Sequence, residues 1–66
     1  MIKLTLVPRK VGKNFERVEL HIFDEPISII SIEEFYAHLG DNDLRSKIYF
    51  SLLSGETVTV YLVEVE

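Results

Sequence analysis

Two alternating segments near the start of the chain constrain its fold most strongly. In residues 2–6 and 17–22, apolar and polar residues follow each other with the two-residue period of a half-buried β-strand. Residues 9–14 between them are rich in turn formers, and the proline just before them is expected to end the first strand. Pairing Leu6 with Val18 puts the apolar residues of both segments on one face. The pattern therefore predicts an antiparallel hairpin.

The middle of the chain carries a helix-start signal. The segment Ser31–Glu34 fits a capping box, in which the serine hydroxyl accepts a hydrogen bond from the backbone N–H of the glutamate three residues later. Phe35 fits the hydrophobic staple that accompanies such a cap, because an apolar residue precedes the serine. Gly40 is a natural helix stop, so we predict a helix over 32–39.

Residues 44–54 fit either a strand or a helix. As a helix, the segment presents one apolar stripe. As a strand, it pairs across a three-residue turn with a last strand over 57–65, in a register that sets Phe50 opposite Val60 in the core. Because that register buries many apolar residues together, the strand is preferred, and the alternative is a second helix over 43–54.

Residues 1–66 are predicted to form one α+β domain in the order hairpin, helix, hairpin (ββαββ). This order resembles the ubiquitin-like β-grasp, a four-stranded sheet with one helix, whose first and last strands lie parallel at the centre. The alternative helix would change the order to ββααβ. Ubiquitin-like modifiers and sulfur carriers end in Gly-Gly, whereas this chain ends in Val63–Glu66, so a carrier or conjugation function is set aside.

Composition limits the chemistry that the chain can perform. The chain has no cysteine, and a secreted domain of this size would usually need disulfides, so a cytoplasmic location is predicted. Its two histidines, His21 and His38, lie on different predicted elements, and no metal site is expected. The serines have roles as caps, turns or surface positions, so we predict no catalytic residue, no cofactor and no enzymatic activity. Apolar runs are too short for a membrane partner.

Charge is divided unevenly along the chain. Residues 1–17 hold five basic residues and one acidic residue, a balance of +4, and the remainder holds two basic and ten acidic residues, a balance of −8. A nucleic-acid interpretation follows, in which cations at the tip of the first hairpin contact phosphates and an aromatic ring stacks on a base. The residues concerned are Arg9, Lys10, Lys13, Phe15 and Arg17. Because the net charge is −4, only weak affinity is expected, and nucleic acid is kept as the alternative partner.

The acidic remainder of the chain indicates a different partner. Carboxylates spaced along a small body can imitate DNA phosphates and occupy the groove of a DNA-processing protein. Two stretches, Gly12–Glu16 and Ser31–Phe35 with Gly40 after it, resemble the small uracil-DNA glycosylase inhibitors of Bacillus phages. That resemblance implies an acidic homodimer that mimics DNA and plugs an apolar cleft of its target with a helix phenylalanine, here Phe35 with Glu34 beside it.

Two positions of the helix differ from the inhibitor family. Tyr36 stands where the family has an acidic residue, and Leu39 corresponds to its helix tyrosine. A homodimer is also expected from the exposed face of the predicted last hairpin, whose first strand contains Tyr49 and lies at a sheet edge. The sequence thus predicts a non-enzymatic, phage-type inhibitor or DNA mimic that binds a host DNA-handling protein, with uracil-DNA glycosylase as the named target. The residues assigned to the contact are Glu33, Glu34, Phe35, Tyr36 and Leu39.

Overall fold

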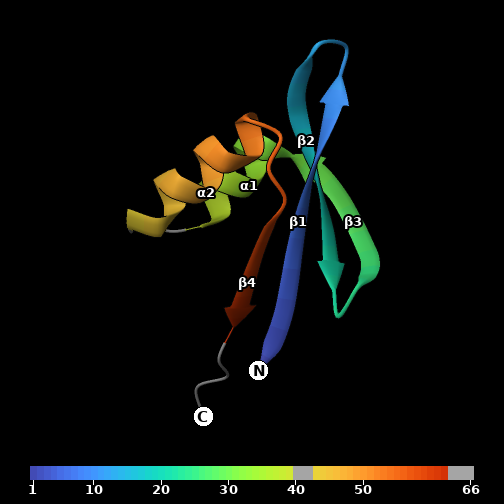
Figure 1. The fold of residues 1–66 in the computed structure, drawn as a ribbon, viewed down its shortest axis with the longest axis vertical. Helices are drawn as coiled ribbons and strands as arrows, with labels where there is room; N and C mark the ends of the chain where they lie inside the picture. The colour runs from blue at the N-terminus through green and yellow to red at the C-terminus, as the bar shows by residue number, and fades with distance from the viewer. Residues whose placement is uncertain (40–42, 63–66) are drawn as a thin grey trace.

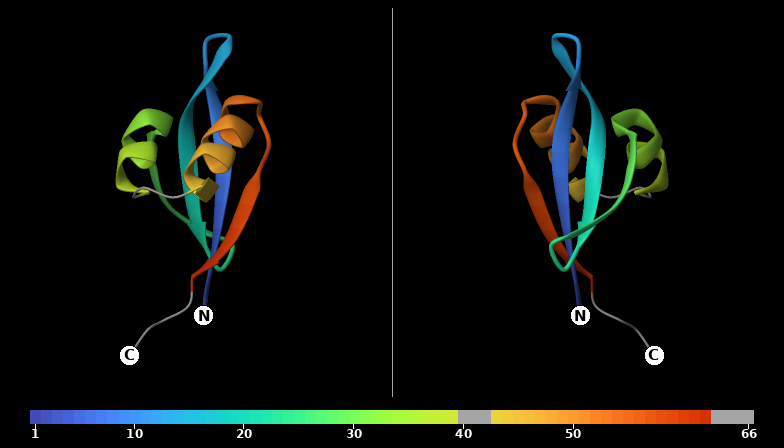
Figure 2. Two further views of the ribbon diagram at one scale, coloured as in Figure 1. Left: turned by 90° about the vertical axis from the view of Figure 1, so that its left-hand side faces the viewer. Right: turned by 90° about the vertical axis from the view of Figure 1, so that its right-hand side faces the viewer.

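The computed structural model of the chain describes residues 1–39 and 43–62. These residues form β1 (Ile2–Val11), β2 (Asn14–Ile22), β3 (Glu25–Ser31), α1 (Ile32–His38), α2 (Asp43–Leu53) and β4 (Val58–Leu62) (Figure 1). The strands make one antiparallel sheet in the order β3-β2-β1-β4. Both helices lie on the same face of the sheet, and the described elements leave the other face open (Figure 2). The predicted α+β class and four-stranded sheet are confirmed.

The predicted hairpin of β1 and β2 is present, with its register shifted by two residues. Leu6 pairs with Leu20, and Pro8 pairs with Val18. A shift of two preserves side-chain parity, so the apolar residues still share one face. Pro8 does not end β1, which continues to Val11. The proline is tolerated because pairing with β4 stops at Leu6, so its missing N–H interrupts no ladder on that side.

β3 was not predicted, and the turn before it explains why. Phe23 and Asp24 join β2 to β3 with φ angles of 49° and 68°, the signs that a two-residue type I′ turn requires at both central positions. Asn-Gly is the usual sequence for that turn, so Phe-Asp gives little signal. Contacts with β1 hold it in place: the Phe23 N–H donates to the Lys3 carbonyl at 3.1 Å, and Lys3 Nζ donates to Asp24 Oδ1 at 3.2 Å.

Helix α1 begins where the capping box predicts. The N–H of Glu34 donates to Ser31 Oγ at 3.0 Å, and Ser31 has the extended backbone of an N-cap. The helix covers Ile32–His38, one residue less than expected at its end. Phe35 is only 8% exposed and Ile30 packs against the same buried cluster. Both residues of the expected staple therefore belong to the core.

The cap predicts a measurable loss of stability on mutation. Ser31→Ala should lower the free energy of unfolding by about 1 kcal/mol, because the Glu34 N–H loses its acceptor. Urea denaturation would measure the change. Ser46→Ala is the matched control, since Ser46 is exposed inside α2 and alanine is the better helix former. Equal midpoints for the two variants would contradict the capping role.

The strand preferred for residues 44–54 is wrong, and the alternative second helix is correct. Residues Asp43–Leu53 form α2, and Phe50 is 64% exposed on it, so Phe50 does not pair with Val60 in a core. The helical spacing instead places Leu52 in the core with Ile48 packed beside it. The β-grasp arrangement is wrong as well, because β4 runs antiparallel to β1 at the sheet edge and not parallel at its centre.

A Schellman motif ends α2 and explains this preference for helix. The Gly55 N–H donates to the Leu52 carbonyl at 3.1 Å, and the Glu56 N–H donates to the Ser51 carbonyl at 2.9 Å. Gly55 has a φ of +86°, in the left-handed region that the motif requires. A Cβ atom at this position would lie 2.6 Å from Cζ of Phe15 in β2. The glycine thus ends the helix and also lets the Phe15 ring approach the backbone.

Gly12 and Gly55 both have a positive φ, so comparing them separates the backbone requirement for glycine from the steric effect of the Phe15 contact. Gly12→Ala should lower the free energy of unfolding by about 1–2 kcal/mol, the penalty for an L-residue in the left-handed region (φ +68°). No steric cost is added, because no atom lies within 4 Å of the position that the new Cβ would occupy. Gly55→Ala should cost more, since the ring of Phe15 must also move. Chemical denaturation of both variants would measure the difference. Equal losses would show that the contact with Phe15 carries no energy.

The core lies between one face of the sheet and the two helices. Its buried apolar side chains are Leu6, Val18, Ile32, Phe35 and Leu52. More large apolar side chains stay exposed among the described residues than are buried: Met1, Val11, Phe23, Ile27, Ile29, Leu44, Phe50, Leu53, Tyr61 and Leu62. None of the helices in the described part of the chain is long and apolar enough to span a membrane.

The homodimer contact was expected at an edge strand containing Tyr49, and the fold has no strand there. Tyr49 is half-buried on α2, so the edge strand that was expected to contain it does not exist. The edges of the described sheet are β3 and β4. The homodimer itself stays a prediction.

Candidate binding surfaces

The α1 residues predicted to contact a partner are divided between surface and core. Glu33 and Glu34 are exposed, Tyr36 and Leu39 are half-buried, and Phe35 is buried. The role of an exposed plug, which the resemblance implied for Phe35, does not fit this fold, because exposing the ring would open the core. The acidic pair is therefore the part of this predicted site that a partner can reach most directly.

An aromatic cluster crosses from α1 to α2. The ring centroids of Tyr36 and Tyr49 are 4.6 Å apart at an interplanar angle of 47°, and those of Tyr49 and Phe50 are 5.7 Å apart at 64°. Both geometries lie in the favourable range for aromatic pairs. The Arg45 guanidinium lies 3.9 Å from the Tyr36 ring centroid, within cation–π distance. Phe50 ends the cluster on the outside of the molecule.

We call Tyr49, Phe50 and Leu53 the α2 surface. Phe50 and Leu53 are exposed, and neighbouring positions on a helix bring the three side chains together. This surface was not predicted from the sequence, because the preferred strand placed Phe50 in the core. One signal was available: written as a helix, residues 43–54 carry Tyr49, Phe50 and Leu53 outside the apolar stripe that faces the core, more than a short helix on a small sheet can bury.

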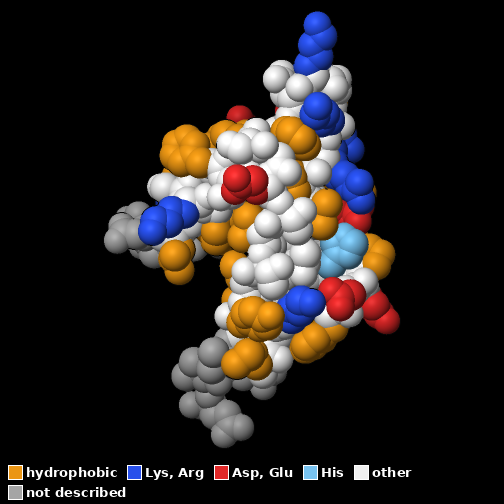
Figure 3. Space-filling model, viewed as in Figure 1, with side chains coloured by type: hydrophobic (Ala, Val, Ile, Leu, Met, Phe, Trp, Pro, Cys, Tyr) orange, Lys and Arg blue, Asp and Glu red, His pale blue; other side chains and the backbone are white. Residues whose placement is uncertain are grey.

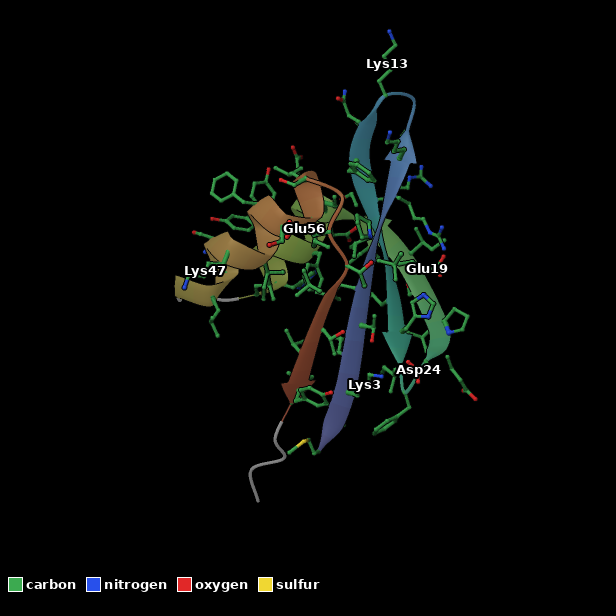
Figure 4. All side chains as sticks on the ribbon, in the orientation of Figure 1. Lys3, Lys13, Glu19, Asp24, Lys47 and Glu56 are labelled. Atoms are coloured by element: carbon green, nitrogen blue, oxygen red, sulfur yellow. The ribbon has the colours of Figure 1, made fainter. Side chains whose placement is uncertain are left out.

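The hairpin of β1 and β2 brings together the five residues predicted for its basic tip, which are Arg9, Lys10, Lys13, Phe15 and Arg17. Residues 9–17, here called the basic arm, extend past the helices, with Lys13 at the end and pointing away from the body (Figures 1 and 4). Lysine and arginine side chains follow the arm in the space-filling view (Figure 3). Phe15 is not free to stack on a base, because Lys10 lies 5.2 Å above its ring and Gly55 lies against it.

A groove of about 780 Å³ separates the basic arm from the helical layer. Apolar side chains in it come from four elements, namely Val11 from β1, Phe15 from β2, Ile32 from α1 and Leu53 from α2. Charged residues of both signs also line it, among them Lys10 and Glu33. The groove therefore adjoins the α2 surface on one side and the basic arm on the other.

A second, smaller cleft lies under the helices. It measures about 360 Å³ and is lined almost entirely by apolar residues of β1, β4 and both helices. Leu44, Tyr61 and Leu62 line it and are exposed. The cleft exists because α1 and α2 cover one part of the sheet and leave the β4 end of the same face uncovered (Figure 1).

The open face of the sheet carries a small charged network. Glu19 accepts hydrogen bonds from Arg9 Nη2 at 3.3 and 3.4 Å, and its Oε1 lies 2.5 Å from His21 Nε2. Figure 4 shows Glu19 on the side of the sheet away from the helices. The Arg9 guanidinium holds the pKa of Glu19 below its ordinary value of about 4.5, and His21 lowers it further, while partial burial acts in the opposite direction.

This network predicts how stability depends on pH. Because the pKa of Glu19 is lower in the folded chain, its carboxylate stabilises the fold above about pH 4.5, and this contribution is lost as pH falls through the folded-state pKa. Glu19→Gln should therefore be less stable than the wild type at neutral pH, and the two should converge in acid. Urea midpoints from pH 7 downward would measure this. A constant difference at all pH values would contradict it.

Comparison with known proteins yields no family assignment. No family model matches the chain, and neither the curated proteins nor the solved structures contain a match. Among the residues that the structure describes, no group of three or more histidine, cysteine, aspartate or glutamate residues is arranged to hold a metal ion. Function must therefore be inferred from the surfaces themselves.

Proposed function

We propose that this chain is a non-enzymatic protein-binding module that docks through the α2 surface. The observation that carries the proposal is Phe50, a large aromatic side chain that is 64% exposed on a helix whose Leu52 and Ile48 pack into the core. Burying such a side chain in an interface contributes about 1.5–3 kcal/mol. Aromatic residues are enriched in protein interfaces, and a few buried anchors usually supply most of the binding energy.

The neighbours of Phe50 favour a docking role over a loose surface position. Its ring meets Tyr49 edge-on, and Tyr49 in turn packs on Tyr36. A side chain that is already held in place loses less conformational entropy when a partner covers it. The α2 surface is thus a pre-ordered apolar patch, and the polar residues around it, such as Ser46 and Lys47, form a solvated rim.

In a more specific version of this proposal, the chain inhibits a DNA-handling protein. The residues that would make the contact then differ from those implied by the resemblance to the uracil-DNA glycosylase inhibitors. A DNA-handling target, with uracil-DNA glycosylase as the named example, would meet the exposed carboxylates of Glu33 and Glu34 and the apolar α2 surface, and Phe35 would act only as core. Exposed carboxylates at the first turn of α1 are suited to a cationic groove. An intracellular target of this kind would also place the chain in the cytoplasm, as its cysteine-free sequence predicts.

Replacing Phe50 tests the proposal. Phe50→Gln should weaken binding of a partner by about 30-fold or more, the loss expected for an interface anchor. The fold should stay within about 0.5 kcal/mol of wild type, since the side chain is exposed. Immobilised wild-type and variant chains would be compared for the proteins that they retain from a bacterial lysate, followed by titration of any protein that the wild type retains.

Ile29→Thr is the matched control. It also removes an exposed apolar side chain, but from the open face of the sheet on the far side from α2, and threonine keeps the strand propensity. The control should bind like wild type. Retention of the same partners by Phe50→Gln would contradict docking through α2. Sedimentation of each variant separates a second copy of the chain from a different protein as the partner.

A further inference from the structure

We propose that the basic arm binds the phosphate backbone of double-stranded nucleic acid by entering its major groove. This activity goes beyond the protein-binding role of α2 and uses residues that role does not need. Beyond Arg17, where pairing of β2 with β3 ends, residues 10–15 of the arm form a two-stranded antiparallel ribbon, and such a ribbon fits the major groove of B-DNA, which is about 12 Å wide.

Charge on the arm has few partners within the molecule. Arg9 and Arg17 stand directly opposite each other in the ladder of β1 and β2. Like charges in that position destabilise a sheet. Glu19 bonds to Arg9, but Lys10, Lys13 and Arg17 form no ion pair with any described residue. A fold that keeps uncompensated cations on one projecting ribbon presents a surface for an anionic partner.

The arrangement of the cations favours a groove over a flat anionic surface. Arg9 lies with Glu19 on the open side of the sheet, whereas Lys10 lines the groove that faces the helices. Lys13 extends from the tip (Figure 4) and also lines this groove. A ribbon with cations on both faces can reach the two phosphate rows that border a groove, while a flat surface would contact one face only.

Distance separates the tip of the arm from the acidic residues at the far end of the sheet. Pairing of β1 with β4 ends at Leu6, and Val11 at the arm end is five residues further along β1. At about 3.3 Å per residue, the tip therefore lies roughly 16 Å beyond the four-stranded part of the sheet. That length is about twice the Debye length of roughly 8 Å at physiological salt, so the carboxylates at the far end of the sheet are largely screened from phosphates at the tip, whereas Glu16 and Glu33 line the groove beside the arm and are not.

Fluorescence anisotropy with a labelled short DNA duplex tests the proposal. The wild type should bind at about 50 mM salt and weaken steeply as salt rises, with log K falling by about 0.9 per phosphate contact for each unit of log salt. Replacing Lys10, Lys13 and Arg17 together by glutamine should reduce that slope by up to about 2.7. Circular dichroism checks that this variant is folded.

One pair of single variants separates the arm from general charge effects. Lys13→Gln and Lys47→Gln each remove one exposed lysine, the first at the arm tip and the second on α2 (Figure 4). Lys13→Gln should lower the salt slope by about 0.9, and Lys47→Gln should leave it unchanged. Equal effects of the two variants would overturn the proposal, because binding would then follow net charge and not the arm.

The remaining outcomes are equally decisive. A single strand of the same sequence should bind more weakly than the duplex, and equal or tighter binding of the single strand would overturn entry of the ribbon into a groove. Absence of duplex binding at about 50 mM salt would overturn the proposal completely, since phosphate contacts are strongest at low salt. Phe50→Gln should bind the duplex like wild type, so failure of the arm proposal is distinguishable from failure of the α2 proposal.

Discussion

The core of this molecule forms on only one face of the sheet, and this constraint determines how its other parts are arranged. Leu6 and Val18 of the sheet are fully buried because Ile32, Phe35 and Leu52 cover them. Two short helices cannot cover more than part of a four-stranded sheet. A domain of this size buries only about 60% of the surface that its unfolded chain exposes, so the small core is expected, and the remaining apolar residues stay at the surface.

That constraint accounts for the position of each candidate surface. Because the helices lie over the middle of one face, the hairpin end projects past them as the basic arm, and the β4 end of the same face borders the small apolar cleft. The face without helices carries the Glu19 network in place of a second core. The exposed apolar side chains of α2 fit the proposal that a partner protein, and not more of this chain, covers them.

Sequence patterns predicted the elements that local chemistry determines. Ser31 has a specific role in the backbone of α1, and the alternation around Leu6 and Val18 requires a sheet with one buried face, so both were predicted correctly. Exact pairing was not predictable from alternation alone, because a shift of two residues, such as the pairing of Pro8 with Val18, preserves every face. β3 was missed because the Phe23–Asp24 turn lacks glycine.

Whether residues 43–54 form a helix or a strand depends on interactions with the rest of the fold, which a local sequence pattern does not contain. Phe50 has high strand propensity, and a strand would have buried it, but the turn chemistry of Gly55 ends a helix and the register of Leu52 completes the core. The basic tip was predictable as a cluster because its residues are close in sequence. Its aromatic member was misjudged, since only the folded chain brings Phe15 against Gly55.

The contact between Phe15 and Gly55 has a consequence for the arm. It joins β2, near the tip of the arm where Phe15 pairs with Lys10, to the turn that ends α2, although Phe15 and Gly55 are forty positions apart in sequence. A two-stranded hairpin on its own is only marginally stable in water and moves freely about its base. Anchored in this way, the ribbon keeps its direction relative to the helices before any ligand arrives, so a partner need not supply the free energy to orient it.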